Sequence, residues 1–456
     1  MEEIKLNNLY TVEITGMNHE GQGVGHIDGY IVFVDGVMPG EQVKIRLTTA
    51  KKSYGKGEVV EIISKSPYRI TPFCSAFGKC GGCSLQHISY KEQLNIKTDM
   101  VRETLKRIGG IENILVHDTI GMDKPLNYRN KAQYPVGVEN GKSVIGFYEA
   151  RSHKIVGSDS CDIQDPLSIE IRETFKQFID KYNISIYDEE TGKGLVRHIM
   201  VRTGFKTGEI MVVIVVNGTS LPYANEFIKE ITSKVNGIKS IILNINTKNT
   251  NVILGEKNIV LYGDGFITDY IGSYKFEISP LSFFQVNPVQ TEVLYQKALD
   301  FAGLTGRETV FDLYCGIGTI SLFLSQKAAK VYGVEVVEDA VKDARRNAEI
   351  NGITNVEFFA GEAEKLIPEM YSREIKADVV VVDPPRKGCD EKLLNTLIEM
   401  EPSRIVYVSC NPSTLARDLK YLCSSGKYVA VEAQPVDMFP WTMHVECVTL
   451  MSKVEK

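Results

Sequence analysis

Hydrophobic and polar positions alternate with a period of two through much of residues 8–63, where short β-branched runs are separated by glycine-rich turns. This pattern is typical of strands that bury one face. The spacing of the runs predicts a small five-stranded barrel of the OB type, a fold that often binds single-stranded nucleic acid. Other small β modules share this spacing, so the pattern alone leaves both interpretations open.

The pattern becomes mixed over residues 67–282. Residues 90–109 form an amphipathic, charged stretch that ends at two glycines, and this stretch predicts a helix. From about residue 125 strand-like runs dominate, and they predict an antiparallel sheet with helices near residues 166–182 and 222–235. We therefore expect a central mixed α+β domain.

The rhythm changes again over residues 283–456, where buried strands alternate with helices. Such alternation predicts a doubly wound, Rossmann-like α/β domain, in which ligands bind at the carboxyl ends of the strands. The fold class is therefore α/β. We expect a barrel at 1–66, the mixed domain at 67–282 and the Rossmann-like domain at 283–456. The expected strands are 309–314, 330–336, 356–361, 377–385, 404–410 and 444–452, and the expected helices are 288–302, 318–328 and 338–351.

Composition narrows the class of protein. The chain has 456 residues, with 43% hydrophobic and 24% charged residues, which suits a soluble globular protein of several domains. There is no apolar run of about 18 residues and no signal peptide, so we expect a cytoplasmic protein without a membrane span. The net charge of −6 argues against a general nucleic-acid binder, so any contact with RNA must come from local patches.

Nine cysteines in a chain of this kind point to metal binding or catalysis rather than to disulfides. Cys74, Cys80 and Cys83 form a C-x5-C-x2-C pattern on a glycine-bearing loop. Three close thiolates repel one another unless a metal neutralises them. Cys161 is the other cysteine before residue 315, and it is the natural fourth ligand. Four thiolates suit either zinc or a [4Fe-4S] cluster, and the spacing does not decide between them.

A second cysteine position follows a buried strand. The stretch "RIVYVSCNPSTLARDL" predicts a strand up to Ser409, a helix N-cap at Asn411 and proline at the first helical position. Cys410 then lies in the turn between the two, where the positive end of the helix favours a thiolate. The alternative is an inert buried cysteine, which is the usual role of a lone cysteine.

A nucleotide-binding pattern begins the α/β domain. "FDLYCGIGTISL" places Asp312, Gly316 and Gly318 where the first strand gives way to its helix, and Glu335 ends the next strand. A carboxylate there can accept hydrogen bonds from both hydroxyls of a ribose. Ser321 stands where a dinucleotide fingerprint has its third glycine, so S-adenosylmethionine fits better than NAD. Asp383, in "VVVDPPRKGC", is expected to face the same crevice.

The motifs together resemble a known family. "ISPLSFFQVNP", "FDLYCGIGTISL", "VVDPPRKG", "VSCNPSTLARDL" and "DMFPWTMHVE" occur in this order, as in the RNA uracil-C5 methyltransferases. The stretch "GMNHEGQGVGHIDGYIVFVDGVMPGE" resembles a TRAM domain, an RNA-binding barrel. With the cysteine loop, nearly the whole chain is similar to the bacterial 23S ribosomal RNA 5-methyluridine methyltransferases. The resemblance also implies that the helix at 90–115 packs on the C-terminal domain.

The resemblance implies roles for individual residues. Cys410 would be the nucleophile that adds to carbon 6 of uracil, and Glu446 the base that removes the proton from carbon 5. The residues implied to contact S-adenosylmethionine are Gln285, Tyr314, Gly316, Glu335 and Asp383. The residues implied to hold a [4Fe-4S] cluster are Cys74, Cys80, Cys83 and Cys161. The target uridine must leave its stack, and candidate RNA contacts are Arg129, Lys131, Arg197 and His198.

Three hypotheses follow for function. The first is methylation of one or more uridines of 23S ribosomal RNA, which the barrel and cysteine loop favour because simpler transfer-RNA members of the family lack both. The second is methylation of transfer RNA. The third is a non-enzymatic iron–sulfur RNA-binding protein, which the presence of Cys410 and Glu446 argues against. We expect a monomer.

Overall fold

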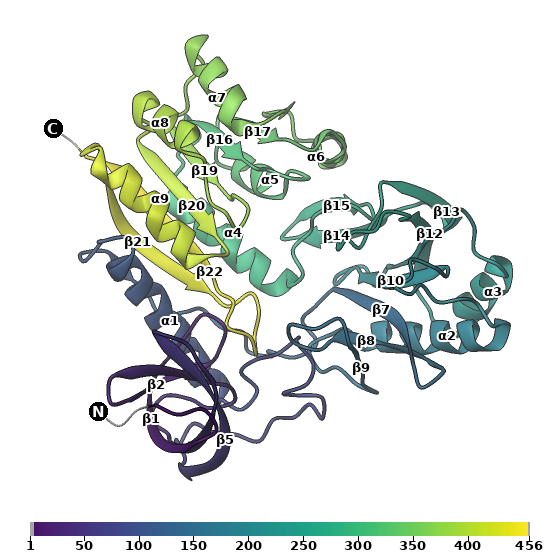
Figure 1. Cartoon of the computed structure of the whole chain (residues 1–456). Coiled ribbons are helices and arrows are strands. Elements are labelled where there is room, and N and C mark those ends of the chain that lie inside the picture. Colours follow the sequence, from purple (N-terminus) through teal and green to yellow (C-terminus); the bar gives the residue numbers. More distant parts are fainter. Residues whose placement is uncertain (1–3, 455–456) are drawn as a thin grey trace.

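The computed structural model describes residues 4–454, and its N-terminal part is a closed five-stranded barrel (Figure 1). The strands pair in the order β1-β2-β3-β5-β4, and alternate residues such as Val12, Ile14 and Val43 fill the interior. The predicted barrel is thereby confirmed. The strands are β1 (Leu9–Met17), β2 (Gly23–Ile27), β3 (Tyr30–Val34), β4 (Gln42–Ala50) and β5 (Tyr54–Ser64).

Helix α1 (Tyr90–Arg107) follows the cysteine loop and lies against the C-terminal domain. It packs on α9 (Pro412–Ser424), and the short strand β6 (Leu115–Val116) pairs in parallel with β21 (Tyr428–Val436) at the edge of that domain's sheet (Figure 1). Val101 and Leu105 of α1 are fully buried there. An early segment of the chain thus completes the last domain.

The central domain contains a seven-stranded sheet in the order β13-β12-β11-β10-β7-β8-β9. Its helices are α2 (Pro166–Tyr182) and α3 (Ala224–Lys234), close to the predicted ranges. The sheet differs from the expected antiparallel one at β11 and β12, which pair in parallel because α3 forms a crossover between them. The strands are β7 (Lys131–Glu139), β8 (Lys142–Tyr148), β9 (Ile155–Gly157), β10 (Val196–Thr203), β11 (Ile210–Val216), β12 (Ile238–Ile245) and β13 (Lys257–Gly263).

A hairpin of β14 (Ile267–Ile271) and β15 (Tyr274–Ile278) leads into the C-terminal domain, an eight-stranded sheet ordered β18-β17-β16-β19-β20-β22-β21-β6. The strands β16 to β20 are parallel, and β22 is antiparallel to both its neighbours. This is the predicted Rossmann-like architecture, with β21 as a strand that the sequence pattern did not predict. The strands are β16 (Thr309–Leu313), β17 (Lys330–Glu335), β18 (Val356–Ala360), β19 (Val379–Val382), β20 (Arg404–Ser409) and β22 (Glu446–Lys453).

Helices cover both faces of this sheet, so its central strands are apolar throughout. Along β19, Val379 and Val381 contact the core on one face, whereas Val380 and Val382 contact the core on the other. Such continuous apolar strands are typical of doubly covered parallel sheets. The helices are α4 (Pro288–Ala302), α5 (Thr319–Ser325), α6 (Glu338–Ile350), α7 (Ala363–Ser372) and α8 (Glu391–Met400), besides α9.

Within residues 4–454, no helix combines the length and apolar character that crossing a membrane requires.

Candidate active site and cysteine cavity

The chain runs from β16 to β17 and β18 on one side of the sheet, and then to β19 and β20 on the other. The switch point therefore lies between β16 and β19, where doubly wound folds bind ligands. A cavity of about 860 Å³ opens there. It is lined by every residue to which the family resemblance assigned a catalytic or cofactor role, namely Gln285, Tyr314, Gly316, Glu335, Asp383, Cys410 and Glu446.

Strand pairing brings Cys410 and Glu446 to the same place, although they are far apart in the sequence. Because β22 is antiparallel to β20, Ser409 at the end of β20 pairs with Cys447 near the start of β22. Cys410 and Glu446 are the next residues in that register, at the cavity. On the other side of β22, Glu446 pairs with Val436, the last residue of β21.

The turn that carries Cys410 is built as the sequence predicted. Asn411 caps α9, since its side chain accepts a hydrogen bond from the Ser413 amide at 3.1 Å, and Pro412 starts the helix. The Asn411 amide group also donates to the Arg386 carbonyl at 3.1 Å, and the Thr414 hydroxyl donates to the same oxygen at 3.2 Å. These contacts fix the cysteine turn to the turn after β19 that carries Asp383.

The charge environment of Cys410 differs from the expected one. Burial raises the pKa of the Cys410 thiol to about 11, and the nearby Glu446 and Asp383 carboxylates add to the rise, while Arg386 opposes it. Burial, together with the Glu446 and Asp383 carboxylates, therefore outweighs the positive end of α9. The free thiol is protonated near neutral pH.

Glu446 and Asp383 form a pair of interacting acids. Burial raises the pKa of Glu446, and the Asp383 carboxylate raises it further. A carboxylate with a raised pKa is a stronger base once it has lost its proton. Cys447, the next residue on the strand, points to the opposite face and packs in the core, as strand alternation requires.

The other end of the cavity suits the nucleoside part of a cofactor. Glu335 ends β17, and its carboxylate accepts hydrogen bonds from the amides of Gly316 at 3.1 Å and Val337 at 2.8 Å, which hold it in place. Tyr314 has a positive φ of 66° in the same turn, and its hydroxyl donates to Glu364 at 2.8 Å.

Ser321, which stands where a dinucleotide fingerprint has its third glycine, binds a buried carboxylate. Its hydroxyl donates to the Asp312 carboxylate at 2.5 Å, and both side chains are fully buried. Burial raises the pKa of Asp312 to about 7. Asp312 therefore lies beneath the cofactor turn, and not among the residues that line the cavity.

The four cysteines outside the α/β domain converge on a second cavity of about 390 Å³. All four are partly buried free thiols. Burial raises the pKa of Cys83 to about 12 and that of Cys161 to about 11, and the neighbouring cysteines add to both. The cavity is lined by Cys74, Cys80, Cys83 and Cys161, among other residues.

Within the described residues, no three cysteine, histidine, aspartate or glutamate side chains are arranged to hold a single metal ion. In a [4Fe-4S] cluster each thiolate binds a different iron, so the sulfurs stand farther apart than around one zinc ion. Four thiols around one cavity match, in number and chemical type, the four-cysteine ligand set that the resemblance implies.

Arg129 and Lys131 line the cysteine cavity. The Arg129 Nε is buried without a hydrogen-bond partner. Burial lowers the pKa of Lys131 to about 7, and the charges of Arg202 and Arg129 lower it further. The two basic side chains thus share a cavity that Asp162 also lines, and their contact with RNA stays a prediction.

Arg197 and His198 lie elsewhere, beside a separate cavity of about 590 Å³. Arg197 is 5% exposed and donates to the carbonyls of Asn246 at 2.9 Å and Lys248 at 2.8 Å. Burial lowers the pKa of His198 to about 4, and Arg197 contributes. The structure thus gives Arg197 a structural contact, and RNA binding by this pair stays a prediction.

Sequence reasoning assigned no role to three residues that line both cavities. These are Arg386, Phe439 and His444. Arg386 comes from the "DPPRKG" motif, and the other two come from "DMFPWTMHVE". The available signal was their place in the family motifs, since Arg386 follows Asp383 and the other two residues precede Glu446. They form a wall shared by the catalytic cavity and the cysteine cavity.

Known proteins resemble both ends of the chain. Residues 267–454 match the family described as tRNA (Uracil-5-)-methyltransferase, and residues 6–60 match the TRAM domain. A protein of Caldanaerobacter subterraneus subsp. tengcongensis, described as an uncharacterized RNA methyltransferase, is 53% identical over 100% of both chains. A relative of Clostridium tetani with the same description is also 53% identical, over 98% of this chain and 97% of its own.

A solved structure is similar over almost the whole length. It is the tRNA (uracil-54, C5)-methyltransferase of Pyrococcus abyssi in complex with S-adenosyl-L-homocysteine, with a TM-score of 0.77 and 31% identity over 97% of this chain and 100% of that chain. Fold and cavity together define an S-adenosylmethionine-dependent RNA methyltransferase. The chain belongs to the RNA (uracil-5-)methyltransferase family with a TRAM domain.

The acidic surroundings of Cys410 give a first prediction. Alkylation of Cys410 by iodoacetamide, followed by peptide mass spectrometry, should rise about tenfold per pH unit from pH 7 to 9, because the thiolate fraction does so below the thiol pKa. Glu446→Gln should speed alkylation by a factor that grows from pH 7 to pH 9, because the pKa of Glu446, raised to about 8, leaves a negative charge to remove mainly at the higher pH. Glu357→Gln is the matched control, because it removes an exposed carboxylate on β18. Equal rates in Glu446→Gln and wild type would contradict the prediction.

Proposed function

We propose that this protein methylates carbon 5 of one or more uridines in 23S ribosomal RNA through a covalent adduct between Cys410 and carbon 6 of the base. The observation that carries the proposal is the strand register that sets Cys410 and Glu446 side by side in the cavity at the switch point. Carbon 5 of uracil is a poor nucleophile, so a group that first adds to carbon 6 splits one hard step into two easier ones.

Each protein residue then has a defined step. The Cys410 thiol gives up its proton to solvent and its sulfur bonds to carbon 6, while the electron pair of the C5–C6 double bond moves toward carbon 5 and O4. S-adenosylmethionine supplies the electrophilic methyl group that carbon 5 attacks. Glu446 takes the proton from carbon 5, the double bond re-forms, and the thiolate of Cys410 leaves. The raised pKa of Glu446 suits this proton transfer.

The positions of the remaining cavity residues support their proposed cofactor role. Glu335, held by two backbone amides, would accept hydrogen bonds from the ribose hydroxyls. Gly316, Tyr314 and Gln285 line the same end of the cavity. Asp383 stands between this end and Cys410 along the sheet edge, where it can contact the cofactor or the flipped base.

We also propose that Cys74, Cys80, Cys83 and Cys161 hold a [4Fe-4S] cluster. The number and chemical type of the thiols around one cavity support it. Burial raises the pKa of the Cys83 and Cys161 thiols, and a cationic partner, which the irons would supply, favours the thiolate form. Methyl transfer needs no electron, so the proposed role of the cluster is to order the loop and the surface beside it.

The RNA target needs a direct test, because a specific finding favours transfer RNA as the second candidate. The Pyrococcus abyssi transfer-RNA enzyme matches 97% of this chain. A match of this extent includes residues of the barrel or of the cysteine loop. These two features therefore do not distinguish an enzyme that acts on ribosomal RNA from one that acts on transfer RNA. The resemblance of nearly the whole chain to the bacterial 23S enzymes, from the motifs, the barrel and the cysteine loop together, supports ribosomal RNA as the first candidate.

The target prediction is tested with RNA from a strain that lacks this protein. With labelled S-adenosylmethionine, we expect label in large-subunit RNA, recovered as 5-methyluridine, and none in bulk transfer RNA. Nuclease protection of the labelled RNA with short complementary DNA then maps the position. Label in transfer RNA alone would transfer the assignment to the second candidate.

The chemistry is tested by two substitutions. Cys410→Ala should abolish methyl transfer while RNA and S-adenosylmethionine still bind, because only the nucleophile is lost. Glu446→Gln should accumulate a protein–RNA adduct that survives a denaturing gel, because the proton on carbon 5 cannot leave. Cys423→Ala, on the same helix α9, is the matched control and should retain full activity. Turnover by Cys410→Ala would remove this residue from the mechanism.

The cluster proposal predicts that Cys80→Ser loses iron while wild-type protein purified without oxygen binds about four irons per chain. Zinc and iron are measured on the same samples, so that zinc in the wild type would contradict the proposal. Cys315→Ser, at a buried cysteine of the α/β core, is the control for iron content. If Cys80→Ser also keeps its fold and normal affinity for RNA, an ordering role is excluded.

A further inference from the structure

The loop between β21 and β22, Asp437–Val445, carries Phe439 and His444 into the wall shared by the two cavities. Its first residue follows Val436, which pairs with Glu446 across the strands. The loop therefore joins Glu446 to its own partner in the ladder, and its last residue, Val445, directly precedes Glu446.

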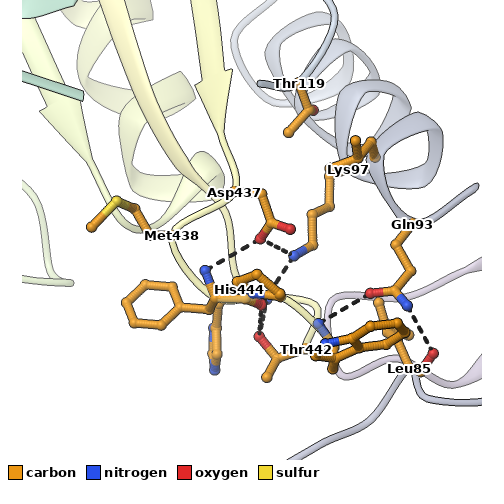
Figure 2. A network of polar contacts seen from close by, with 12 residues as sticks. Leu85, Gln93, Lys97, Thr119, Asp437, Met438, Thr442 and His444 are labelled. Carbon is orange, nitrogen blue, oxygen red and sulfur yellow. Dashed lines mark hydrogen bonds and ion pairs between the residues drawn. The ribbon is translucent and has the colours of Figure 1, made fainter. Parts of the chain in front are cut away.

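A buried ion pair holds the start of this loop (Figure 2). Lys97 of α1 contacts Asp437 with an Nζ–Oδ1 distance of 2.6 Å, and both side chains are fully buried. Lys97 also donates to the Phe439 carbonyl at 3.2 Å. The same Asp437 oxygen accepts the Phe439 amide at 3.2 Å, and Tyr90 donates its hydroxyl to the other oxygen at 2.9 Å.

The middle of the loop is held by the segment that follows the cysteine loop. The amides of Ser84 and Leu85, directly after Cys83, both donate to the Trp441 carbonyl at 3.0 Å. The fully buried Gln93 accepts the Trp441 amide at 3.1 Å and donates to the Leu85 carbonyl at 3.1 Å (Figure 2). Lys97 and Gln93 are one turn apart on α1, so one helix face binds both parts of the loop.

From this geometry we propose that Lys97 and Asp437 are positioning residues, whose ion pair holds the loop Asp437–Val445 so that Glu446 reaches carbon 5 of the uracil bound to Cys410. The proposal rests on the proposed roles of Cys410 and Glu446. Cys410 itself is positioned by other contacts, through Asn411 and Thr414 to Arg386. Loss of the ion pair should therefore impair proton removal more than attack by the thiolate.

The buried Lys97–Asp437 ion pair can be removed in two ways that differ in their effect on stability. Removal of one partner leaves an uncompensated buried charge, whereas replacement of both by apolar residues is often neutral for stability. Lys97→Met alone should therefore lower the Tm strongly, and the double variant Lys97→Met/Asp437→Leu should recover it. The double variant still lacks the acceptor for the Phe439 amide and the donor to its carbonyl, so the loop is released without loss of the fold.

We expect the double variant to have a kcat about 100-fold below wild type, with KM for RNA within about twofold, because a misplacement of about 1 Å costs about that much. The covalent protein–RNA adduct should accumulate on a denaturing gel, because its resolution needs Glu446. The matched control is Lys176→Met/Asp180→Leu, which removes an ion pair on α2, away from both cavities, and should leave kcat unchanged.

Wild-type kcat in Lys97→Met/Asp437→Leu at wild-type Tm would overturn the proposal, and so would a loss of turnover without adduct. If the double variant does not fold, Tyr90→Phe provides the test, since it removes one donor to Asp437 and leaves both charges. It should show a several-fold lower kcat with adduct present, and an unchanged kcat would overturn the proposal. Failure of the underlying chemistry is distinguishable, because it appears as turnover by Cys410→Ala.

Discussion

The antiparallel pairing of β22 with β20 is the constraint on which the active site depends. A purely parallel sheet brings only strand ends and the loops that follow them to its carboxyl edge. Here β22 enters from that edge, so its first residue, Glu446, stands beside Cys410 at the end of β20. The proposed nucleophile and the proposed base thus come from two adjacent strands. The hydrogen-bonded ladder sets the distance between their backbones, and the loop before β22 is proposed to direct the Glu446 side chain.

This arrangement has an electrostatic cost. Asp383 and Glu446 lie near Cys410 in one cavity; both carboxylates raise the pKa of the thiol, and Asp383 raises the pKa of Glu446. Arg386 is the cation that opposes the rise for both Cys410 and Glu446. In the free protein the Cys410 thiol is therefore mostly protonated, and its proposed role as nucleophile requires that the bound substrate favour the thiolate. A reactive thiolate that formed only with the substrate in place would also be protected from oxidation and alkylation between turnovers.

Local sequence patterns predicted local structure well. The strand, the Asn411 cap and Pro412 around Cys410 agree with the structure, because propensity and capping act over a few residues. The convergence of four cysteines on one cavity also agrees, because the chemistry of close thiols demanded a fourth partner. Strand β21 was not predicted, because its exposed Val429 and its Glu432 break the buried run by which the other strands of this domain were identified. The raised pKa of Cys410 depends on Glu446 and Asp383, which only the tertiary fold brings near.

The contact between Lys97 and Asp437 shows what no local pattern could predict. On α1, Gln93 and Lys97 have the composition of a solvated helix face, yet both are fully buried against a loop more than 300 residues away. A buried ion pair is weak evidence for stability, because apolar residues of similar size would serve as well or better. What an apolar pair does not provide is a set of directed hydrogen bonds to the backbone at Phe439. The retention of charge at this site is therefore better explained by the geometry it imposes on the loop before Glu446 than by any contribution to the free energy of unfolding.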